Sequence, residues 1–400
     1  MTPTAAEIRA LVPPPPNVEA DVRAIVADVR EGGDDAVRRF TERFDHAELA
    51  PEQLRVPLEE IETAPGTLPP DVLAGLRTAI ANVRALAEAQ RHGPVLVELE
   101  QGQVVEVAER PVRRAAAYVP GGRAPYPSTV VMCAVTASVA GVEELAVCAP
   151  PGPGGLAHPT ILAACALCGV GEVYRMGGAQ AIAALAYGTE SVPAVDVIVG
   201  PGNAYVTEAK RQVAGAVGID GLAGPSELVV VATDGADPEL VALDLLAQAE
   251  HGPDSLCVAI SPDRALLDAV EAATGGRATC VEVASAQEAV RLADEVAPEH
   301  LQLMGADAED LAPLVRSAGA LFVGREAGTA FGDYVAGSNH VLPTGGAARF
   351  ASGLSPATFR RRMARISLTP GAAARLAPAG AAIARAEGFP VHAESMERRA

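Results

Sequence analysis

Short apolar runs recur along most of this chain, and longer segments with apolar residues at helical spacing separate them. The short runs predict strands and the longer segments predict helices. The predicted strands are Ala115–Val119, Leu145–Ala149, Val173–Met176, Val195–Val199, Leu228–Ala232, Leu256–Ile260, Thr279–Val283, Leu301–Met304 and Leu321–Val323. This repeated βα order predicts parallel sheets with helices on their faces.

The strands are too many for one open sheet of ordinary size. The expected fold class is therefore α/β, with two doubly wound, incomplete Rossmann-like parallel-sheet domains, N-terminal helices and a helical C-terminal extension. Residues 1–118 are assigned to the N-terminal helices and the first part of one α/β domain, and 226–355 to the remainder of that domain. Residues 119–225 are assigned to the other α/β domain, and 356–400 to a helical C-terminal region and arm.

Two segments depart from the βα rhythm. Val95–Leu99 and Gln103–Val107 alternate apolar and polar residues across a glycine turn, which predicts a hairpin. Near the C-terminus the pattern predicts helices over Ala357–Ile366 and Thr369–Glu387, followed by an extended arm over Gly388–Ala400.

Composition narrows the class of protein. The 400 residues include no tryptophan and carry a net charge of −19, which argues against nucleic acid or an anionic membrane as a partner. No signal peptide or membrane span is predicted. Six cysteines are too few for a disulfide scaffold, and the lone pair Cys165 and Cys168 lies in an apolar run that indicates core packing. We therefore expect a cytoplasmic protein.

Three glycine-rich turns follow predicted strands. They are Tyr118-Val-Pro-Gly-Gly-Arg123, Met176-Gly-Gly-Ala-Gln180 and Gly200-Pro-Gly-Asn203. Such turns allow close approach of a ligand, and a helix that begins there favours phosphate. Ordinary turns and a capping asparagine explain the same residues equally well. None is the dinucleotide fingerprint G-x-G-x-x-G, so the pattern alone predicts no nicotinamide cofactor.

Polar residues that could carry chemistry gather in the second half of the chain. Gln248 and His251 share one face at a helix end, and the adjacent Glu299 and His300 form a plausible acid/base pair on a loop. Ser226, Asp333, Glu387 and His392 are further candidates. A set of nitrogen and oxygen ligands without cysteine suits zinc or manganese. In isolation, each of these residues is explained by a turn, a helix end or a solvated loop.

Seven motifs in order give the sequence a resemblance to the histidinol dehydrogenases over nearly its whole length. They are Tyr118-Val-Pro-Gly-Gly-Arg, Gly177-Gly-Ala-Gln-Ala-Ile-Ala, Gly200-Pro-Gly-Asn-Ala-Tyr-Val, Ala223-Gly-Pro-Ser-Glu, Gln248-Ala-Glu-His, Ala297-Pro-Glu-His-Leu and Gly332-Asp-Tyr-Val-Ala-Gly-Ser-Asn-His-Val-Leu-Pro-Thr. The resemblance implies oxidation of L-histidinol to L-histidine through the aldehyde with two NAD, in the last steps of histidine biosynthesis.

The resemblance also implies roles for particular residues. Zinc, one ion per subunit, would be bound by Gln248, His251, Asp333 and His392. NAD would contact Tyr118, Gln180 and Asn203, and Glu299 and His300 would transfer protons. The substrate would contact Ser226, Gln248, His251, His300, Asp333, Glu387 and His392. The family's members are homodimers in which the C-terminal arm completes the active site of the partner.

Three other functions stay open at this point. The chain could oxidise a different polar alcohol with the same fold and cofactor, it could be a zinc-dependent hydrolase that uses Glu299, or it could be a non-catalytic binding protein. Because an imidazole base works best near or above its own pKa, dehydrogenase activity through His300 predicts a somewhat alkaline optimum.

Overall fold

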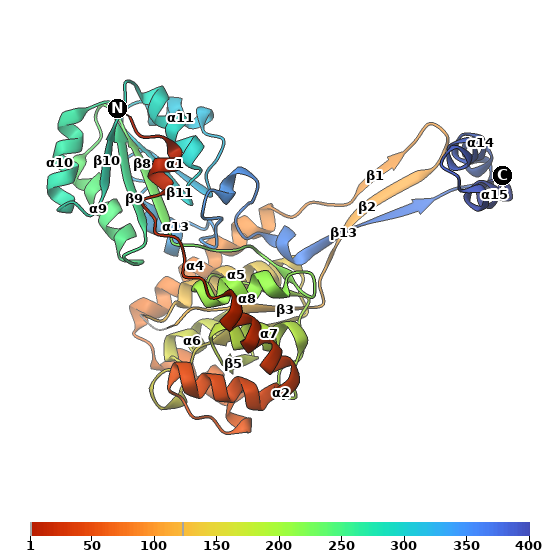
Figure 1. Cartoon of the computed structure of the whole chain (residues 1–400), viewed down its shortest axis with the longest axis horizontal. Coiled ribbons are helices and arrows are strands. Elements are labelled where there is room, and N and C mark those ends of the chain that lie inside the picture. Colours follow the sequence, from red (N-terminus) through yellow and green to blue (C-terminus); the bar gives the residue numbers. More distant parts are fainter. Residues whose placement is uncertain (1, 122–123) are drawn as a thin grey trace.

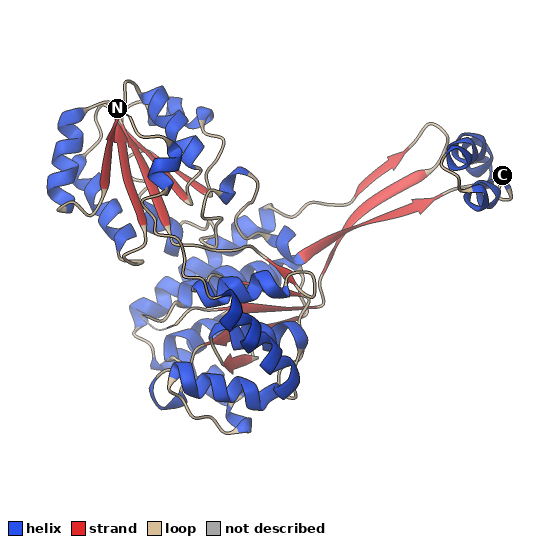
Figure 2. Cartoon of the chain, in the orientation of Figure 1, coloured by secondary structure: helices blue, strands red, loops and turns tan. Residues whose placement is uncertain are grey.

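A computed structural model describes residues 2–121 and 124–400, which form two α/β domains and a projecting arm (Figure 1). Each domain is built on a parallel sheet of five strands, and the arm is a three-stranded antiparallel sheet that ends in two helices (Figure 2). The predicted fold class is confirmed. The last two residues of the predicted turn Tyr118–Arg123 lie outside the described residues.

The first sheet has the strand order β5-β4-β3-β6-β7. Its strands are β3 (Arg114–Tyr118), β4 (Glu144–Ala149), β5 (Val173–Arg175), β6 (Val197–Val199) and β7 (Gly218–Ile219). Side chains alternate across the central strand β3, because successive residues of a strand point to opposite faces. Ala115 and Ala117 pack in one hydrophobic layer, and Ala116 and Tyr118 pack in the other. Small residues at the centre let helices lie close to both faces.

Helices that precede β3 in the sequence and helices that follow it together cover the two faces of this sheet. One layer contains α4 (Pro70–Ala89), α5 (Pro127–Ala140) and α6 (Pro159–Leu167), preceded by α3 (Leu58–Thr63) and the 3-10 turn η2 (Ala64–Thr67). The other layer contains α2 (Glu19–Asp45), α7 (Gly178–Tyr187) and α8 (Ala204–Val213). The helix α5 is apolar all round, which is typical of a helix buried between neighbours.

The second sheet repeats this topology with the strand order β10-β9-β8-β11-β12. Its strands are β8 (Glu227–Ala232), β9 (Leu256–Ser261), β10 (Thr279–Glu282), β11 (His300–Met304) and β12 (Ala320–Val323). One face carries α9 (Pro238–Ala249) and α10 (Arg264–Thr274), and the other carries α11 (Ala286–Val296), α12 (Ala308–Leu311) and the N-terminal helix α1 (Ala5–Arg9). In both sheets the first strand is central and the order changes direction beside it.

The predicted domain assignment differs from this topology for residues 1–118. The chain changes sheets between Ile219 and Glu227, an interval that contains the proposed boundary at residue 225. However, residues 1–118 were assigned to the domain of 226–355, whereas β3 pairs with β4 and β6. The helices α2 and α4 pack in the same domain as β3, because their apolar stripes meet α7 and α5. The helix α1 contacts α11 of the second domain.

The arm corrects two predictions and confirms one. The hairpin is present as β1 (Val95–Glu98) and β2 (Val104–Pro111). The helix predicted over 357–366 is wrong, because Arg360–Ser367 forms strand β13, paired with all eight residues of β2. The extended end predicted over 388–400 is also wrong, because α14 (Pro370–Ala386) is followed by α15 (Pro390–Glu397), which packs back on it.

Other expectations concern membranes and thiols. Within the described residues, no helix combines the length and apolarity that crossing a membrane requires. All six cysteines are free, and burial raises the pKa of Cys165 and Cys168. Since the thiolate is the reactive form, these two cysteines are suited to packing rather than to redox chemistry.

Candidate active site

The polar residues of the second domain gather at the amino-terminal edge of its sheet. Ser226 immediately precedes β8, and Glu299 immediately precedes the neighbouring strand β11. Helices that connect parallel strands run back in the opposite direction, so the C-terminal end of α9 returns to the same edge and brings Gln248 and His251 with it. Residues far apart in the sequence therefore meet at one edge of the second sheet.

Glu299 is buried and held by two hydrogen bonds to one carboxylate oxygen. Its Oε2 accepts from Ser226 Oγ at 2.5 Å and from the backbone N–H of Glu227 at 2.9 Å. Gln248 Nε2 in turn donates to Ser226 Oγ at 2.7 Å. Burial raises the pKa of Glu299, while His300 and the two hydrogen bonds partly oppose the rise. A carboxylate whose pKa is raised is a better proton acceptor than one in water.

His300 has a defined orientation of its ring. Nδ1 lies 3.0 Å from the carbonyl oxygen of Glu227, and because a carbonyl can only accept, Nδ1 donates. In the neutral ring Nε2 is therefore unprotonated, and it lies 3.7 Å from Asp333 Oδ1. The free lone pair of His300 thus faces the carboxylate of Asp333.

Asp333 also faces His251, with Oδ2 lying 3.9 Å from Nε2 of that histidine. Gln248 and His251 come from the end of α9, and Asp333 comes from α13 (Thr329–Tyr334). Among the described residues, no group of three or more His, Cys, Asp or Glu side chains is arranged to hold a metal ion. Two of the four predicted ligands, His251 and Asp333, thus lie together, and Gln248 adjoins them on α9.

His392 and Glu387 lie apart from these residues in the same chain. His392 is exposed on α15 and its ring packs edge-on against Phe389, with ring centroids 5.2 Å apart. Glu387 is the exposed residue that ends α14. Both helices lie at the tip of the arm, away from the two α/β domains (Figure 1). One chain therefore does not bring all the predicted substrate and zinc residues together.

His340 ties Asp333 to the first domain. Nδ1 of His340 donates to the backbone carbonyl of Asp333 at 2.9 Å, so the neutral ring accepts from Thr129 Oγ1 at Nε2, at 3.1 Å. Loss of solvent around the ring lowers the pKa of His340, which favours this neutral form. Asn339 donates to Met132 of the same helix, α5, at 3.1 Å. The sequence analysis assigned no role to His340, although this histidine lies only seven residues after Asp333.

The carboxyl edge of the first sheet holds the residues predicted to bind NAD. Tyr118 ends β3, and its hydroxyl accepts from the backbone N–H of Gly178 at 3.1 Å, at the start of α7. Gln180 lies in the first turn of α7 and is 1% exposed. Among the described residues, neither its amide oxygen nor its amide nitrogen has a hydrogen-bond partner. A buried, unpaired amide at a strand-to-helix turn fits a site that a polar ligand completes.

Asn203 follows β6 and caps α8, since its Oδ1 accepts from the backbone N–H groups of Tyr205 and Val206. The simple capping interpretation is therefore correct for the amide oxygen of Asn203. The preceding Gly200 has a φ of +105°, and a Cβ at this position would lie 2.1 Å from the Tyr118 carbonyl oxygen. Glycine is thus required where the loops after β3 and β6 meet.

A buried ion pair that the sequence analysis missed fixes this loop. Lys210 Nζ donates to the Gly200 carbonyl and to Asp220 Oδ1, both at 2.6 Å, and Asp220 Oδ2 accepts from the Gly200 N–H at 2.7 Å. One feature of the sequence could have pointed to this ion pair, because Lys210 is the single lysine among the 31 lysine and arginine residues of the chain. Arginine serves at every other basic position.

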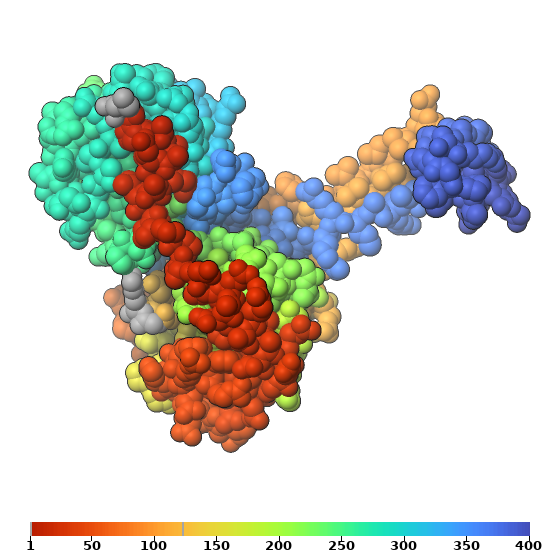
Figure 3. All heavy atoms as spheres, in the orientation of Figure 1, coloured from red at the N-terminus to blue at the C-terminus, as the bar shows by residue number. Residues whose placement is uncertain are grey.

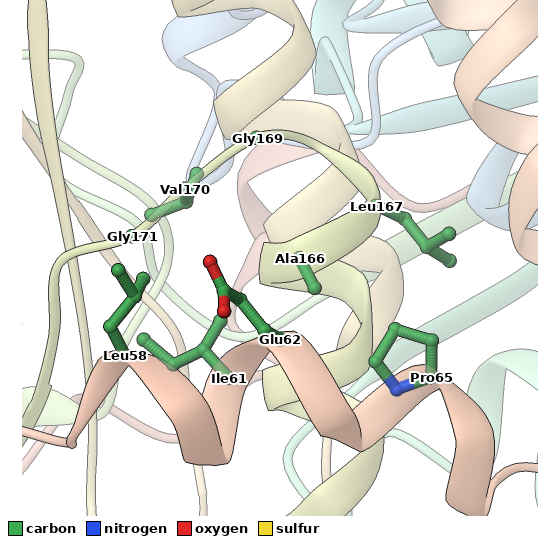
Figure 4. Close-up of a pocket in the computed structure, with 9 residues that line it drawn as sticks. All are labelled: Leu58, Ile61, Glu62, Pro65, Ala166, Leu167, Gly169, Val170 and Gly171. Atoms are coloured by element: carbon green, nitrogen blue, oxygen red, sulfur yellow. The ribbon is translucent and has the colours of Figure 1, made fainter.

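A pocket of about 350 Å³ lies elsewhere, between α3–η2 and the end of α6 (Figure 4). Leu58, Ile61 and Pro65 line one wall, and Leu167 and Val170 contribute to the other. Glu62 is the only ionisable residue in this lining. The pocket is on the outer side of the first domain and lacks the groups that acid/base or metal chemistry needs.

Comparison with known proteins shows the family to which this chain belongs. Residues 14–400 match the family model for histidinol dehydrogenase. The chain is 46% identical to a histidinol dehydrogenase from Gluconobacter oxydans, over 96% of this chain and 93% of that protein. It is also 46% identical to one from a Synechococcus species, over 95% of this chain and 92% of that protein.

A solved structure extends the agreement to three dimensions. The crystal structure of histidinol dehydrogenase from Elizabethkingia anophelis superposes with a TM-score of 0.94 at 31% identity, covering 100% of this chain and 96% of that one. The chain therefore belongs to the histidinol dehydrogenase family of oxidoreductases.

Proposed function

We propose that this chain oxidises L-histidinol to L-histidine through L-histidinal with two NAD, as the last steps of histidine biosynthesis. The observation that carries the proposal is the pair Glu299 and His300, which presents two proton acceptors beside Asp333. The family to which the chain belongs supports the choice of substrate. No membrane or nucleic acid is required, and a cytoplasmic location stays a prediction.

The donor set suits zinc, the metal that the family resemblance implies. His251 and Asp333 supply an imidazole nitrogen and a carboxylate, Gln248 supplies an amide oxygen, and no cysteine takes part. The proposed fourth ligand, His392, comes from the arm of a second copy. These residues would hold the zinc, which would supply a positive charge that fixes the amino alcohol in place.

His300 is the proposed base of the first oxidation. Its Nδ1 is committed to the carbonyl of Glu227, so Nε2 is left to accept the proton of the substrate hydroxyl. Asp333 Oδ1 lies 3.7 Å from this nitrogen. The carbinol carbon would lose its hydride to NAD held by the first domain and would become the aldehyde carbon.

Glu299 is the proposed base of the second oxidation. Adding water to L-histidinal gives a hydrate, and this addition needs a group that removes a proton from water. The carboxylate of Glu299 is buried, has a raised pKa and is fixed by Ser226 and the Glu227 N–H. Loss of a second hydride from the hydrate to a second NAD, with loss of a proton, gives the carboxylic acid.

The proposed cofactor residues Tyr118, Gln180 and Asn203 line the carboxyl edge of the first sheet, beside its topological switch point. The unpaired amide of Gln180 gives a polar ligand both a donor and an acceptor. His340 links Thr129, which lies at the start of α5 on this edge, to the Asp333 backbone. This link joins the proposed cofactor and substrate halves of the site.

We further propose a homodimer in which each arm completes the other copy's site. Support comes from the place of His392 and Glu387 at the tip of the arm. The arm also exposes apolar side chains, among them Leu96, Ile366 and Val391, which are 64–74% exposed. Exposed apolar side chains on a projecting arm are consistent with an interaction surface.

The decisive experiment incubates the purified protein with L-histidinol and NAD and follows NADH by absorbance. We expect two NADH per histidinol, loss of activity on treatment with a chelator, and recovery with zinc. If the folded, zinc-loaded protein gives no NADH from histidinol, the substrate assignment is wrong. NADH from another polar alcohol in a panel would then identify the alternative substrate.

A further inference from the structure

The N-terminal helix α1 carries an arginine, Arg9, that contacts residues next to the proposed catalytic pair. Arg9 Nη1 donates to Glu227 Oε1 at 2.7 Å, and Nη2 donates to Glu227 Oε2 at 3.3 Å. The same guanidinium donates through Nε to the carbonyl of Val296 at 2.8 Å and through Nη2 to that of Ala297 at 3.1 Å. One side chain thus binds both the start of β8 and the turn between α11 and β11.

Glu227, the partner of Arg9, contacts both proposed catalytic residues. Its carboxylate accepts from the Glu299 N–H at 3.2 Å, its own N–H donates to the Glu299 carboxylate at 2.9 Å, and its carbonyl accepts from His300 Nδ1. Gly345 N–H donates to the remaining side of the Glu227 carboxylate at 3.0 Å. The position of Glu227 therefore fixes the carboxylate of Glu299 and the ring of His300 together.

The turn that Arg9 holds has an unfavourable backbone conformation. Ala297 has a φ of +49°, in the left-handed region that residues other than glycine rarely adopt. It lies two residues before Glu299, and Arg9 binds its carbonyl and that of Val296. A conformation of this kind persists only where its surroundings enforce it.

We propose that Arg9 is a positioning residue for the oxidation, acting through Glu227 and the Ala297 turn to orient Glu299 and His300. The proposal rests on the proposed roles of Glu299 and His300. Arg9 lies before residue 14, where the match to the family model begins. Figure 3 shows the N-terminal segment in red, running over the surface of the second domain before it crosses to the first.

The positive charge of Arg9 offsets the negative charge of the buried Glu227 carboxylate. The side chain of Glu227 is 3% exposed, and its carboxylate adds to the rise in the pKa of the neighbouring Glu299. Without Arg9, the buried carboxylate of Glu227 would lose this ion pair while it lies beside the carboxylate of Glu299. A buried charge that loses its partner forces local rearrangement, and here the rearranged segment carries the proposed bases.

The test compares Arg9→Ala with Arg38→Ala as a matched control. Arg38 also binds a backbone carbonyl, that of Leu49 at 2.6 Å, and its side chain is 27% exposed against 24% for Arg9. It lies on α2 in the first domain. We expect Arg9→Ala to lower kcat about ten- to a hundredfold, since small misplacements of reacting groups are costly, while KM and zinc content stay unchanged. Arg38→Ala should keep the kcat of the unaltered protein.

Two further measurements separate positioning from general loss of stability. Ethylguanidinium should restore part of the kcat of Arg9→Ala and leave Arg38→Ala unchanged, because the partly exposed cavity left by Arg9 can admit it. Arg9→Lys keeps the charge but lacks the planar fork, so we expect a lowered kcat at an unchanged thermal midpoint. This variant keeps the proposal testable if Arg9→Ala does not fold.

Hydrogen exchange of the segment 296–301, followed by mass spectrometry, needs no substrate. We expect faster exchange there in Arg9→Ala and Arg9→Lys, because the hydrogen bond from the Glu299 N–H to the Glu227 carboxylate opens more often. Unchanged kcat in both variants, or lowered kcat with unchanged exchange, would overturn the proposal. If the unaltered protein does not oxidise histidinol, the proposed function fails, and the exchange comparison still decides whether Arg9 holds the Glu299 turn.

Discussion

Replacing Glu299 with glutamine separates the two oxidation steps. The carboxylate uses one oxygen, Oε2, to accept from Ser226 Oγ and from the Glu227 N–H. A glutamine side chain has a carbonyl oxygen that can occupy the same place and accept both hydrogen bonds. Glu299→Gln therefore keeps the local structure and removes the ability to take a proton.

The expected loss of activity falls on the second step. A positioned general base contributes about 10²–10⁴-fold to a rate, so oxidation of L-histidinal should slow by a factor in that range. The first oxidation uses Nε2 of His300, and the Nδ1 of this ring donates to the Glu227 carbonyl, a bond that Glu299→Gln leaves in place. Glu299→Gln should therefore convert histidinol to the aldehyde and then stall.

Although Glu299→Gln lowers activity, it should increase the stability of the folded protein at neutral pH. Burial raises the pKa of Glu299, so the folded protein binds this proton more tightly than the unfolded chain does. As pH rises above the unfolded value of about 4.3, ionisation favours the unfolded chain, and stability falls until the raised folded pKa is passed. Glu299→Gln lacks this loss, so it should be more stable than the unaltered protein at neutral pH and equal to it below about pH 4.

The assay measures NADH per histidinol, the rate with L-histidinal as substrate, and the thermal midpoint from acid to neutral pH. Glu295→Gln, at an exposed position that pairs with Arg291, is the matched control and should change none of the three. Two NADH per histidinol at the unaltered rate, or a lower thermal midpoint at neutral pH, would refute the reasoning about Glu299.

Four further predictions test other parts of the molecule. Co-expressing Glu299→Gln and His392→Asn, each inactive alone in forming histidine, should restore about a quarter of the activity, because half of randomly mixed dimers carry one intact shared site. Gln180→Leu should raise the Michaelis constant for NAD and also raise the thermal midpoint without NAD, since the amide is buried and unpaired among the described residues. Gly200→Ala should cost about 1–3 kcal/mol of unfolding free energy beyond Gly215→Ala, a control with a φ of +100° and open space for a Cβ, as thermal melts can show. Lys210→Met should destabilise the fold by about 3–5 kcal/mol in denaturant titrations, because Asp220 keeps a buried charge without its partner.

Most of the two α/β domains could be predicted from the sequence because their signals are local. A buried parallel strand is a short apolar run, and each predicted strand from Ala115 to Val323 corresponds to a strand of the structure. The glycine-rich turns were visible for the same reason. At Gly200 the close approach to Tyr118 demands glycine, so the residue type itself marks where two loops meet.

The arm could not be predicted because its structure depends on a distant segment. Arg360–Ser367 contains four arginines, a methionine and an alanine, which are good helix formers, and the sequence alone favoured a helix. Pairing with the whole of β2, about 250 residues earlier, overrides that preference. The domain assignment of residues 1–118 failed for a similar reason, since nothing local shows which of two similar sheets a strand joins.

Within the site, candidate residues that lie close together in the sequence could be recognised. Hydrogen bonds between distant segments could not be predicted. Glu299 and His300 are adjacent, and Gln248 and His251 lie three apart, so each pair could be recognised by itself. The bonds that join the pairs run through Ser226, whose separation from Glu299 is 73 residues. His340 was visible as a residue, but its bond to Thr129, 211 residues earlier, was not.

The arrangement of the site explains why a single chain should have little activity of its own. The proposed bases come from the amino edge of the second sheet and the proposed cofactor residues from the carboxyl edge of the first, and the His340 contact joins them within one chain. His392, however, lies on α15. The arm sheet holds α14 and α15 at its tip, away from both domains. In the proposed homodimer, association of two copies completes the proposed zinc set. Zinc binding should consequently stabilise the dimer, because a ligand held jointly by two subunits binds the associated state more tightly than the separated chains.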